Sequence, residues 1–258
     1  MLEALGSTLS LRKKLLFGLA CCRRVGFLLT DERASRALTL VERFADGQIG
    51  PDDLAAAQPK VRAAVEDASF ERWRAEADTD FSTHPADSAA AAVEVAVYAV
   101  AALFDESASG HAPRTLDFEW AVGRTPHEHA ASAARLWAEA LSWRAYSPRQ
   151  GEVRVSRYHR LGATAGRWAL WSEEEAQVRL LREVVGPPDR PAVSAWLSEP
   201  VVGLTRAIYS KGGWGVLPVL ADALEEAGCI DARLLAHCRE RLGHIRGCWV
   251  IDLLLGRV

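Results

Sequence analysis

The segment from Cys229 to Leu255 concentrates the side chains of this chain that can bind a metal ion or act as nucleophiles. Thiolate sulfur and imidazole nitrogen are preferred ligands of zinc, and both groups also serve in nucleophilic catalysis. The segment contains three of the five cysteines and two of the seven histidines: Cys229, Cys238, Cys248, His237 and His244. A metal-binding or nucleophilic site is therefore expected in this segment.

Spacing limits which of these residues can share one ion. His244, Cys248 and Asp252 recur every four residues, so a helix over residues 245–255 would place them on one face. A helix rises about 1.5 Å per residue, so His244 and Asp252 would lie roughly 12 Å apart. Zinc holds its ligands at about 2.0–2.3 Å, so these two cannot bind one ion, whereas neighbouring members of the series can.

Further ligands must come from the preceding helix, which we expect over residues 232–242. His237 or Cys238 can reach His244 and Cys248 across a turn at Gly243. The sequence thus allows a zinc site formed by His237, Cys238, His244 and Cys248, with Cys22 or Cys229 as a further ligand. The segment lacks the Cys-x2-Cys spacing that is typical of zinc knuckles.

The competing interpretation is that the cysteines fill the hydrophobic core. Free cysteine is among the most buried residue types and packs as a small apolar side chain. Cys22, Cys238 and Cys248 occupy apolar stripes of the expected helices, which favours packing over metal binding. A nucleophilic pair of Cys248 with His244 is a third interpretation, but no motif for an oxyanion hole accompanies it, so we assign no catalytic residue.

Asp252 interrupts an otherwise apolar run near the C-terminus. A buried carboxylate without a partner is very costly, so Asp252 must be paired or hydrogen-bonded. We expect a structural ion pair with Arg246, or else with an arginine from the N-terminal region. A functional role for the carboxylate is the alternative.

Composition indicates a globular protein without a polyanion-binding surface. The chain has 258 residues, 49% of them hydrophobic and 25% charged, and a net charge of −3. The basic residues Lys13, Lys14, Arg23 and Arg24 are expected to form a solvated helix face rather than a nucleic-acid site. No apolar run reaches the roughly 18 residues of a membrane span, and the N-terminus has no signal-peptide pattern.

The cysteines favour a reducing environment. Their number, five, is odd, and Cys21 and Cys22 are adjacent, which makes a poor disulfide framework in a chain of this length. We therefore expect free thiols, a cytoplasmic location, and no membrane or nucleic-acid partner.

Periodicity and capping signals predict nine to eleven helices and an all-α fold, namely an irregular bundle with solenoid-like stacking as an option. Thr125, Pro126 and Glu128 mark a helix start, and residues 172–175 mark another. Gly186, followed by two prolines, marks a helix end. Residues 147–166 read as a linker, with a short strand over residues 153–155. We expect helical regions at 1–150 and 151–258, or one continuous domain.

Two stretches near the ends of the chain resemble a large uncharacterised family of paralogous proteins from planctomycete bacteria. The first is LRKKLLFGLACCRRV at residues 11–25; the second comprises LPVLADALEEAGC at 217–229 and HIRGCWVIDLLL at 244–255. The middle of the chain departs from the family pattern at residues 184–191 and 240–243. The resemblance implies a helical unit whose two ends pack together, with Cys22 near Cys238 or Cys248, and brings no established activity.

No P-loop, dinucleotide-binding, nucleophile-elbow or metalloprotease motif is present in the sequence, which argues against the common enzyme classes. We therefore expect a non-enzymatic interaction or scaffold module that holds a protein partner. The alternative is a zinc-binding domain, zinc being the one cofactor for which the sequence offers ligands. A regulatory or defence-associated protein that acts with neighbouring gene products is a weaker option.

Overall fold

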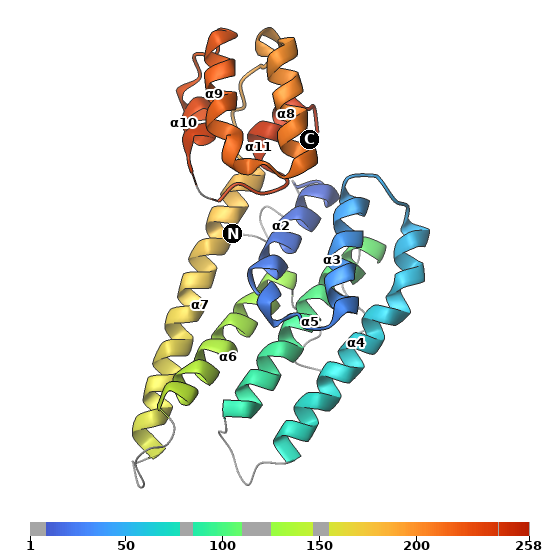
Figure 1. Cartoon of the computed structure of the whole chain (residues 1–258), viewed down its shortest axis with the longest axis vertical. Coiled ribbons are helices and arrows are strands. Elements are labelled where there is room, and N and C mark those ends of the chain that lie inside the picture. The colour runs from blue at the N-terminus through green and yellow to red at the C-terminus, as the bar shows by residue number, and fades with distance from the viewer. Residues whose placement is uncertain (1–8, 78–84, 110–124, 147–154, 242, 258) are drawn as a thin grey trace. The chain divides into compact units, whose positions relative to one another are not determined.

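A computed structural model describes residues 9–77, 85–109, 125–146, 155–241 and 243–257 (Figure 1). Within these ranges the chain forms ten α-helices, short 3-10 helices and no strand, so the predicted all-α bundle is confirmed. The α-helices are α2 (Leu11–Arg24), α3 (Glu32–Ala45), α4 (Pro51–Ala77), α5 (Pro85–Ser109), α6 (Pro126–Tyr146), α7 (Val155–Val185), α8 (Glu199–Lys211), α9 (Leu217–Glu226), α10 (Ala232–Arg239) and α11 (Trp249–Leu254). None of the helices in the described ranges is both long enough and apolar enough to cross a membrane.

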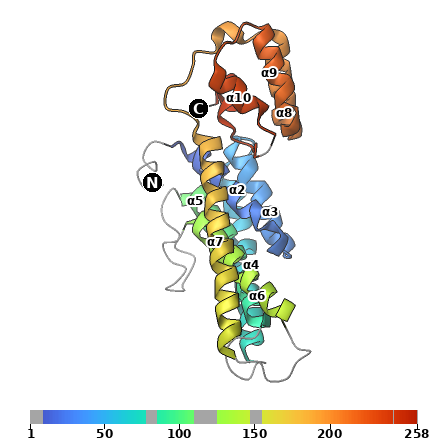
Figure 2. The same cartoon turned by 90° about the vertical axis from the view of Figure 1, so that its left-hand side faces the viewer.

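Some predicted helix boundaries are confirmed and others are wrong. Glu128 reaches back to the backbone N–H of Thr125 at 2.7 Å, which is the predicted cap of α6. Helix α7 ends at Val185, directly before Gly186. The same helix begins at Val155 and is continuous, so residues 155–166 are neither linker nor strand, and residues 172–175 do not start a helix (Figure 2).

The linker prediction failed because a glycine inside a helix costs only about 1 kcal/mol relative to alanine, which a helix of 31 residues tolerates. The remainder of the predicted linker and strand, residues 147–154, lies outside the described residues. The predicted division at residue 150 falls in that same stretch.

The chain divides into two compact units. Unit 1 comprises Met1–Phe17 with Val178–Val258, and unit 2 comprises Gly18–Gln177. The dividing points lie inside helices α2 and α7.

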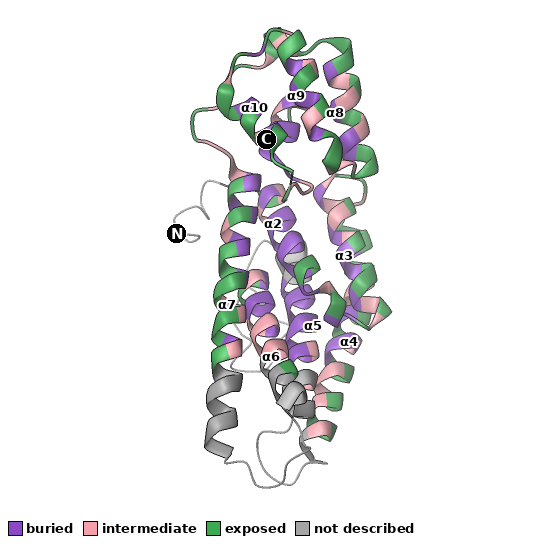
Figure 3. Ribbon diagram, turned by 60° about the vertical axis from the view of Figure 1, so that its left-hand side comes forward, coloured by how far each residue is buried: buried purple, intermediate pink, exposed green. Residues whose placement is uncertain are grey.

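Unit 2 is built around the alanine-rich helix α5, which packs on α4 and α6 and is among its most buried elements (Figure 3). Small side chains let neighbouring helices approach closely. The unit also buries one polar network, in which the Glu94 carboxylate accepts hydrogen bonds from Ser69, Tyr98 and Arg72, each at 2.9 Å. The buried alanines of α5 include Ala92, Ala96, Ala99 and Ala102.

Unit 1 has a leucine-rich core formed by the four C-terminal helices. Helix α9 packs on both α8 and α10, and α11 contacts α8 and α10. Asp231 caps α10 by accepting hydrogen bonds from the backbone N–H groups of Arg233 and Leu234, each at 3.0 Å. The core includes Leu217, Leu220, Leu224, Leu234, Cys238, Trp249 and Ile251.

Candidate metal centre

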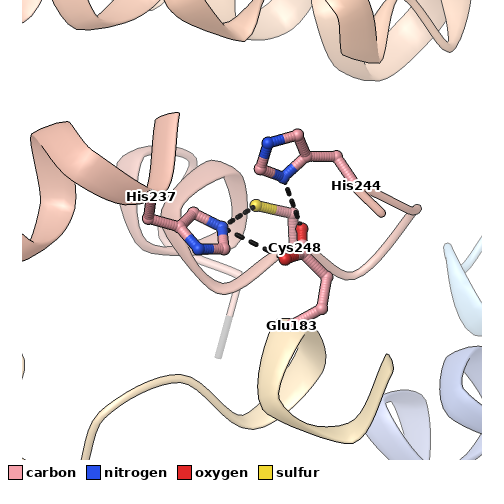
Figure 4. A group of neighbouring side chains, drawn as sticks. All are labelled: Glu183, His237, His244 and Cys248. Carbon is pink, nitrogen blue, oxygen red and sulfur yellow. Dashed lines mark hydrogen bonds and ion pairs between the residues drawn. The ribbon is translucent and has the colours of Figure 1, made fainter. Parts of the chain in front are cut away.

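Four side chains of unit 1 converge as a metal site would require (Figure 4). Glu183, His237, His244 and Cys248 each offer one ligand atom, and these atoms all lie within 4.8 Å of one another. Among the described residues this is the group of histidines, cysteines and carboxylates that meets the geometry of a metal centre. We call these four residues the EHHC cluster.

The cluster contains three of the four predicted ligands, His237, His244 and Cys248. Glu183 stands in place of the fourth, Cys238. Cys238 lies in the leucine-rich core with no exposed surface, and burial raises its pKa to about 12. Cys248 is buried in the same core, so what separates the two cysteines is that Cys238 is not among the four converging side chains. Packing, the competing interpretation, is the role that this position supports for Cys238. Cys229 also lies in that core, and Cys22 belongs to unit 2. Glu183 takes the position that the sequence left to a cysteine.

Glu183 and His237 come from helix ends. Glu183 lies in the last turn of α7, and His237 lies in the last turn of α10. Helix α7 ends at Gly186, whose φ of 67° suits glycine. A Cβ on Gly186 would lie 2.5 Å from Cγ of Trp249, so the missing side chain lets Trp249 pack against the end of α7. This contact brings the residue before Trp249, the candidate ligand Cys248, to the same end of α7 as Glu183.

His244 and Cys248 come from the connection between α10 and α11, and here the helix prediction was wrong. Helix α11 begins at Trp249 with Cys248 as its N-cap, so residues 245–248 form a turn. The backbone N–H of Cys248 donates to the carbonyl of Ile245 at 3.0 Å. Gly247 has a φ of 99°, which an extending α-helix cannot accommodate. His244 and Cys248 thus meet through a turn rather than along a helix face.

The distances within the cluster are close to those of a tetrahedral zinc shell. Glu183 Oε1 lies 2.9 Å from His244 Nδ1, and Glu183 Oε2 lies 3.3 Å from His237 Nε2. His237 Nε2 also lies 3.3 Å from Cys248 Sγ. Ligands held at about 2.0–2.3 Å around one tetrahedral ion are roughly 3.3–3.7 Å apart. The four ligand atoms all lie within 4.8 Å of one another, so the more distant pairs would have to move closer to surround one ion.

Both ring nitrogens of His244 face oxygen acceptors. Nδ1 faces the Glu183 carboxylate, and Nε2 lies 2.9 Å from the backbone carbonyl of Glu240. Neither oxygen can donate, so the ring carries a proton on each nitrogen. Burial alone would lower the pKa of His244, but the hydrogen bond and charge of Glu183 raise it above 6.5. A metal ion on Nδ1 would replace one proton and keep Nε2–H on a backbone carbonyl, as is usual for metal-bound histidine.

Glu183 and Cys248 differ in protonation for physical reasons. Burial alone would raise the pKa of Glu183, but hydrogen bonds and charge from the two histidines lower it to about 2. Burial raises the pKa of Cys248 well above 9.0, and the negative charge of Glu183 adds to this effect. The carboxylate is therefore ionised and the thiol protonated. A divalent cation bound by the cluster would displace protons from Cys248 and His244.

Asp252 is not part of the cluster but pairs with the N-terminal helix. Its side chain is 1% exposed, and its carboxylate lies 2.7 Å from Arg12 and 2.5 Å from Lys13. Arg246, the partner named from the sequence, instead donates to the carbonyl of Tyr209 at 3.1 Å. An N-terminal arginine was the stated alternative, and the ends of the chain pack together in unit 1. Lys13 is buried, so its assignment to a solvated face was wrong.

Sequence reasoning missed Glu183, although one signal was present. Helix C-termini favour positive side chains because the last carbonyls carry partial negative charge. Glu183, a carboxylate in the last turn of α7, goes against this preference. Such a residue needs partners that can donate hydrogen bonds, and here the imidazole nitrogens of His237 and His244 lie 3.3 and 2.9 Å from its carboxylate oxygens.

Comparison of the chain with protein-family models, curated protein sequences and solved structures gives no match, so the interpretation of the site depends on its own chemistry.

Proposed function

We propose that unit 1 is a zinc-binding domain in which the EHHC cluster holds one structural zinc ion. The observation that carries the proposal is the convergence of four ligand atoms, within 4.8 Å, from the ends of two helices and the turn before a third. The hydrogen bond of His244 Nε2 to a backbone carbonyl adds the outer contact that metal-binding histidines usually have.

The ligand types favour zinc over other cations. Calcium and magnesium prefer oxygen ligands, whereas a set of two imidazoles, one thiolate and one carboxylate suits zinc. Four protein ligands fill a tetrahedral shell, and the side chains are buried: His237, the most accessible, is 12% exposed. A catalytic zinc keeps one position open to water or substrate, so the cluster supports a structural role.

The zinc ion would link segments that are far apart in the sequence. Glu183 lies 61 residues before His244, and the other ligands lie between or just beyond. Because an ion that binds only the folded state stabilises it, about 4 kcal/mol would be gained when free zinc is 1,000 times its dissociation constant.

Metal analysis tests the proposal directly. The full chain, purified without a histidine tag, is expected to carry stoichiometric zinc by elemental analysis. Cys248→Ser should lose the ion, and its cobalt-loaded form should lose the thiolate-to-cobalt charge-transfer band. Cys238→Ser is the matched control, because Cys238 is equally buried but lies outside the cluster. It should retain zinc and lose only stability.

Two outcomes would overturn the proposal. One is wild-type protein that takes up no zinc or cobalt after chelation and reloading. The other is Cys248→Ser that retains zinc as well as Cys238→Ser does.

A scaffold role with a protein partner is a second proposal, and exposed aromatic side chains favour it. In unit 2, Trp168 and Trp171 of α7 are 62% and 58% exposed, and their rings are in edge contact. Large exposed aromatics are enriched at protein interfaces. Trp168→Ala with Trp171→Ala should keep the helical content and release a partner that copurifies with the wild type. A variant that keeps all its partners would contradict this role.

The location and the family also remain proposals. All five cysteines are free and buried, which supports the cytoplasmic location expected from the sequence. The pairing of Arg12 and Lys13 with Asp252 supports the implied packing of the two ends that resemble the planctomycete family. A search for genomic neighbours that recur with this chain would test the family assignment.

A further inference from the structure

Lys13 of helix α2 contacts the backbone beside two residues of the EHHC cluster. Its ammonium nitrogen is 3.0 Å from the backbone carbonyl of Val184 and 2.9 Å from that of Gly247. Val184 follows the ligand Glu183, and Gly247 precedes the ligand Cys248. One side chain therefore binds the backbone next to two ligands that come from different segments.

The ammonium group is fully used in this arrangement. It has three N–H donors, and its three partners are the two carbonyls and the Asp252 carboxylate at 2.5 Å. Lys13 is 3% exposed, so water cannot substitute for a lost partner without opening the structure. The carbonyls of Val184 and Gly247 thus have fixed positions relative to each other.

Close packing supports the same positioning. A Cβ built on Gly247 would lie 3.1 Å from Cδ1 of Leu16 and 3.6 Å from Cγ2 of Val184. The first turns of α2, the end of α7 and the turn before Cys248 are therefore in van der Waals contact. Only glycine combines this approach with a φ of 99°.

We propose that Lys13 is a positioning residue of the metal centre, which couples zinc binding to the docking of residues 11–17 in unit 1. This inference depends on the proposed zinc site. By thermodynamic linkage, the docked helix segment favours zinc binding and bound zinc favours the docked segment to the same extent. Loss of a partner that hydrogen-bonds a metal ligand directly typically lowers metal affinity by about 10–100-fold. Lys13 binds the backbone one residue away from two of the ligands, so for Lys13→Met we expect the lower end of this range, a loss of about tenfold.

The direction of the change in zinc affinity separates a positioning role from simple charge repulsion. Lys13 and Arg12 both carry positive charge near the centre, so removal of either charge alone would strengthen the binding of a divalent cation. Lys13→Met also removes the two carbonyl contacts, so its affinity should fall. Arg12→Met removes a positive partner of the same Asp252 carboxylate and leaves the Lys13 contacts in place. The zinc affinity of this variant should therefore not fall.

The experiment uses the full chain and zinc in competition with a chromophoric chelator. Wild type, Lys13→Met and Arg12→Met are compared, and cobalt spectra of each report the ligand geometry. The proposal expects weaker binding and an altered cobalt spectrum only for Lys13→Met. If wild type binds no metal, the proposed zinc site itself fails. If wild type binds zinc and Lys13→Met equals it in affinity and spectrum, the zinc site stands and the role of Lys13 is overturned.

Hydrogen exchange on the wild-type chain keeps the inference testable if Lys13→Met does not fold. Zinc should slow amide exchange in residues 11–17 as well as in the segments that carry the ligands. Slower exchange at the ligands with unchanged exchange in residues 11–17 would refute the coupling.

Discussion

Replacement of Asp252 by asparagine tests the buried charge cluster that joins the two ends of the chain. The change keeps the size of the side chain and removes its charge. Asp252 accepts from Arg12 at 2.7 and 3.1 Å and pairs with Lys13 at 2.5 Å. An asparagine has one acceptor oxygen, and its amide N–H groups would face a cation. Lys13, which is 3% exposed, would then be a buried cation without a counter-charge.

The expected loss is large for a single isosteric change. Breaking a buried ion pair by removing one partner costs about 3–5 kcal/mol. With a urea m-value near 2 kcal/mol/M, the unfolding midpoint of unit 1 should fall by about 1.5–2.5 M. The assay is a urea titration followed by circular dichroism. Hydrogen exchange of residues 199–257 assigns the transition to unit 1. Tryptophan fluorescence could not do so, because the nine tryptophans are not confined to unit 1.

An exposed ion pair of the same unit provides the matched control. Asp189 accepts two hydrogen bonds from Arg233, each at 2.9 Å, and its side chain is 73% exposed. Exposed pairs contribute about 0.2–1 kcal/mol, so Asp189→Asn should change the midpoint little. Equal midpoint shifts for Asp252→Asn and Asp189→Asn would refute the reasoning that burial makes the Asp252 pairs costly to break.

Gly186, His244 and Glu94 offer three other tests. Gly186→Ala should destabilise unit 1 by about 2–4 kcal/mol in urea titrations, because the methyl group meets Trp249 at 2.5 Å and φ is +67°; an unchanged midpoint would show that the contact yields freely. In the presence of a chelator, protonated His244 stabilises the folded protein at pH values below the usual histidine pKa of 6.5. This contribution to the free energy of unfolding is lost as pH rises through the raised pKa of His244 in the folded protein. With zinc the trend should reverse, since binding displaces protons; midpoints that move the same way with and without zinc would contradict the site. Glu94→Gln in unit 2 should cost about 2–4 kcal/mol, as a buried carboxylate with three donors becomes an amide; unfolding of unit 2 at the wild-type midpoint would contradict this.

Local signals in the sequence predicted some of the helix boundaries and three of the four residues of the EHHC cluster. The cap formed by Thr125 and Glu128 and the stop at Gly186 act through neighbouring residues, so both could be predicted. His237, His244 and Cys248 lie within twelve residues of one another, and their side-chain types alone identified them as candidate ligands. These features depend on short-range geometry, which the order of residues largely sets.

Tertiary packing decided the composition of the centre. Glu183 is one of several acidic residues on α7; its place in the last turn makes it unusual, but only the approach of α10 and the turn before α11 gives it two histidine partners. Cys238 and Cys248 look alike in sequence, and both are fully buried in the leucine-rich core, yet only Cys248 has its sulfur beside a histidine, 3.3 Å from His237 Nε2. Lys13 reaches Val184 and Gly247 across 171 and 234 residues of chain. Such contacts depend on how whole helices pack, and helical periodicity carries no information about partners so far away.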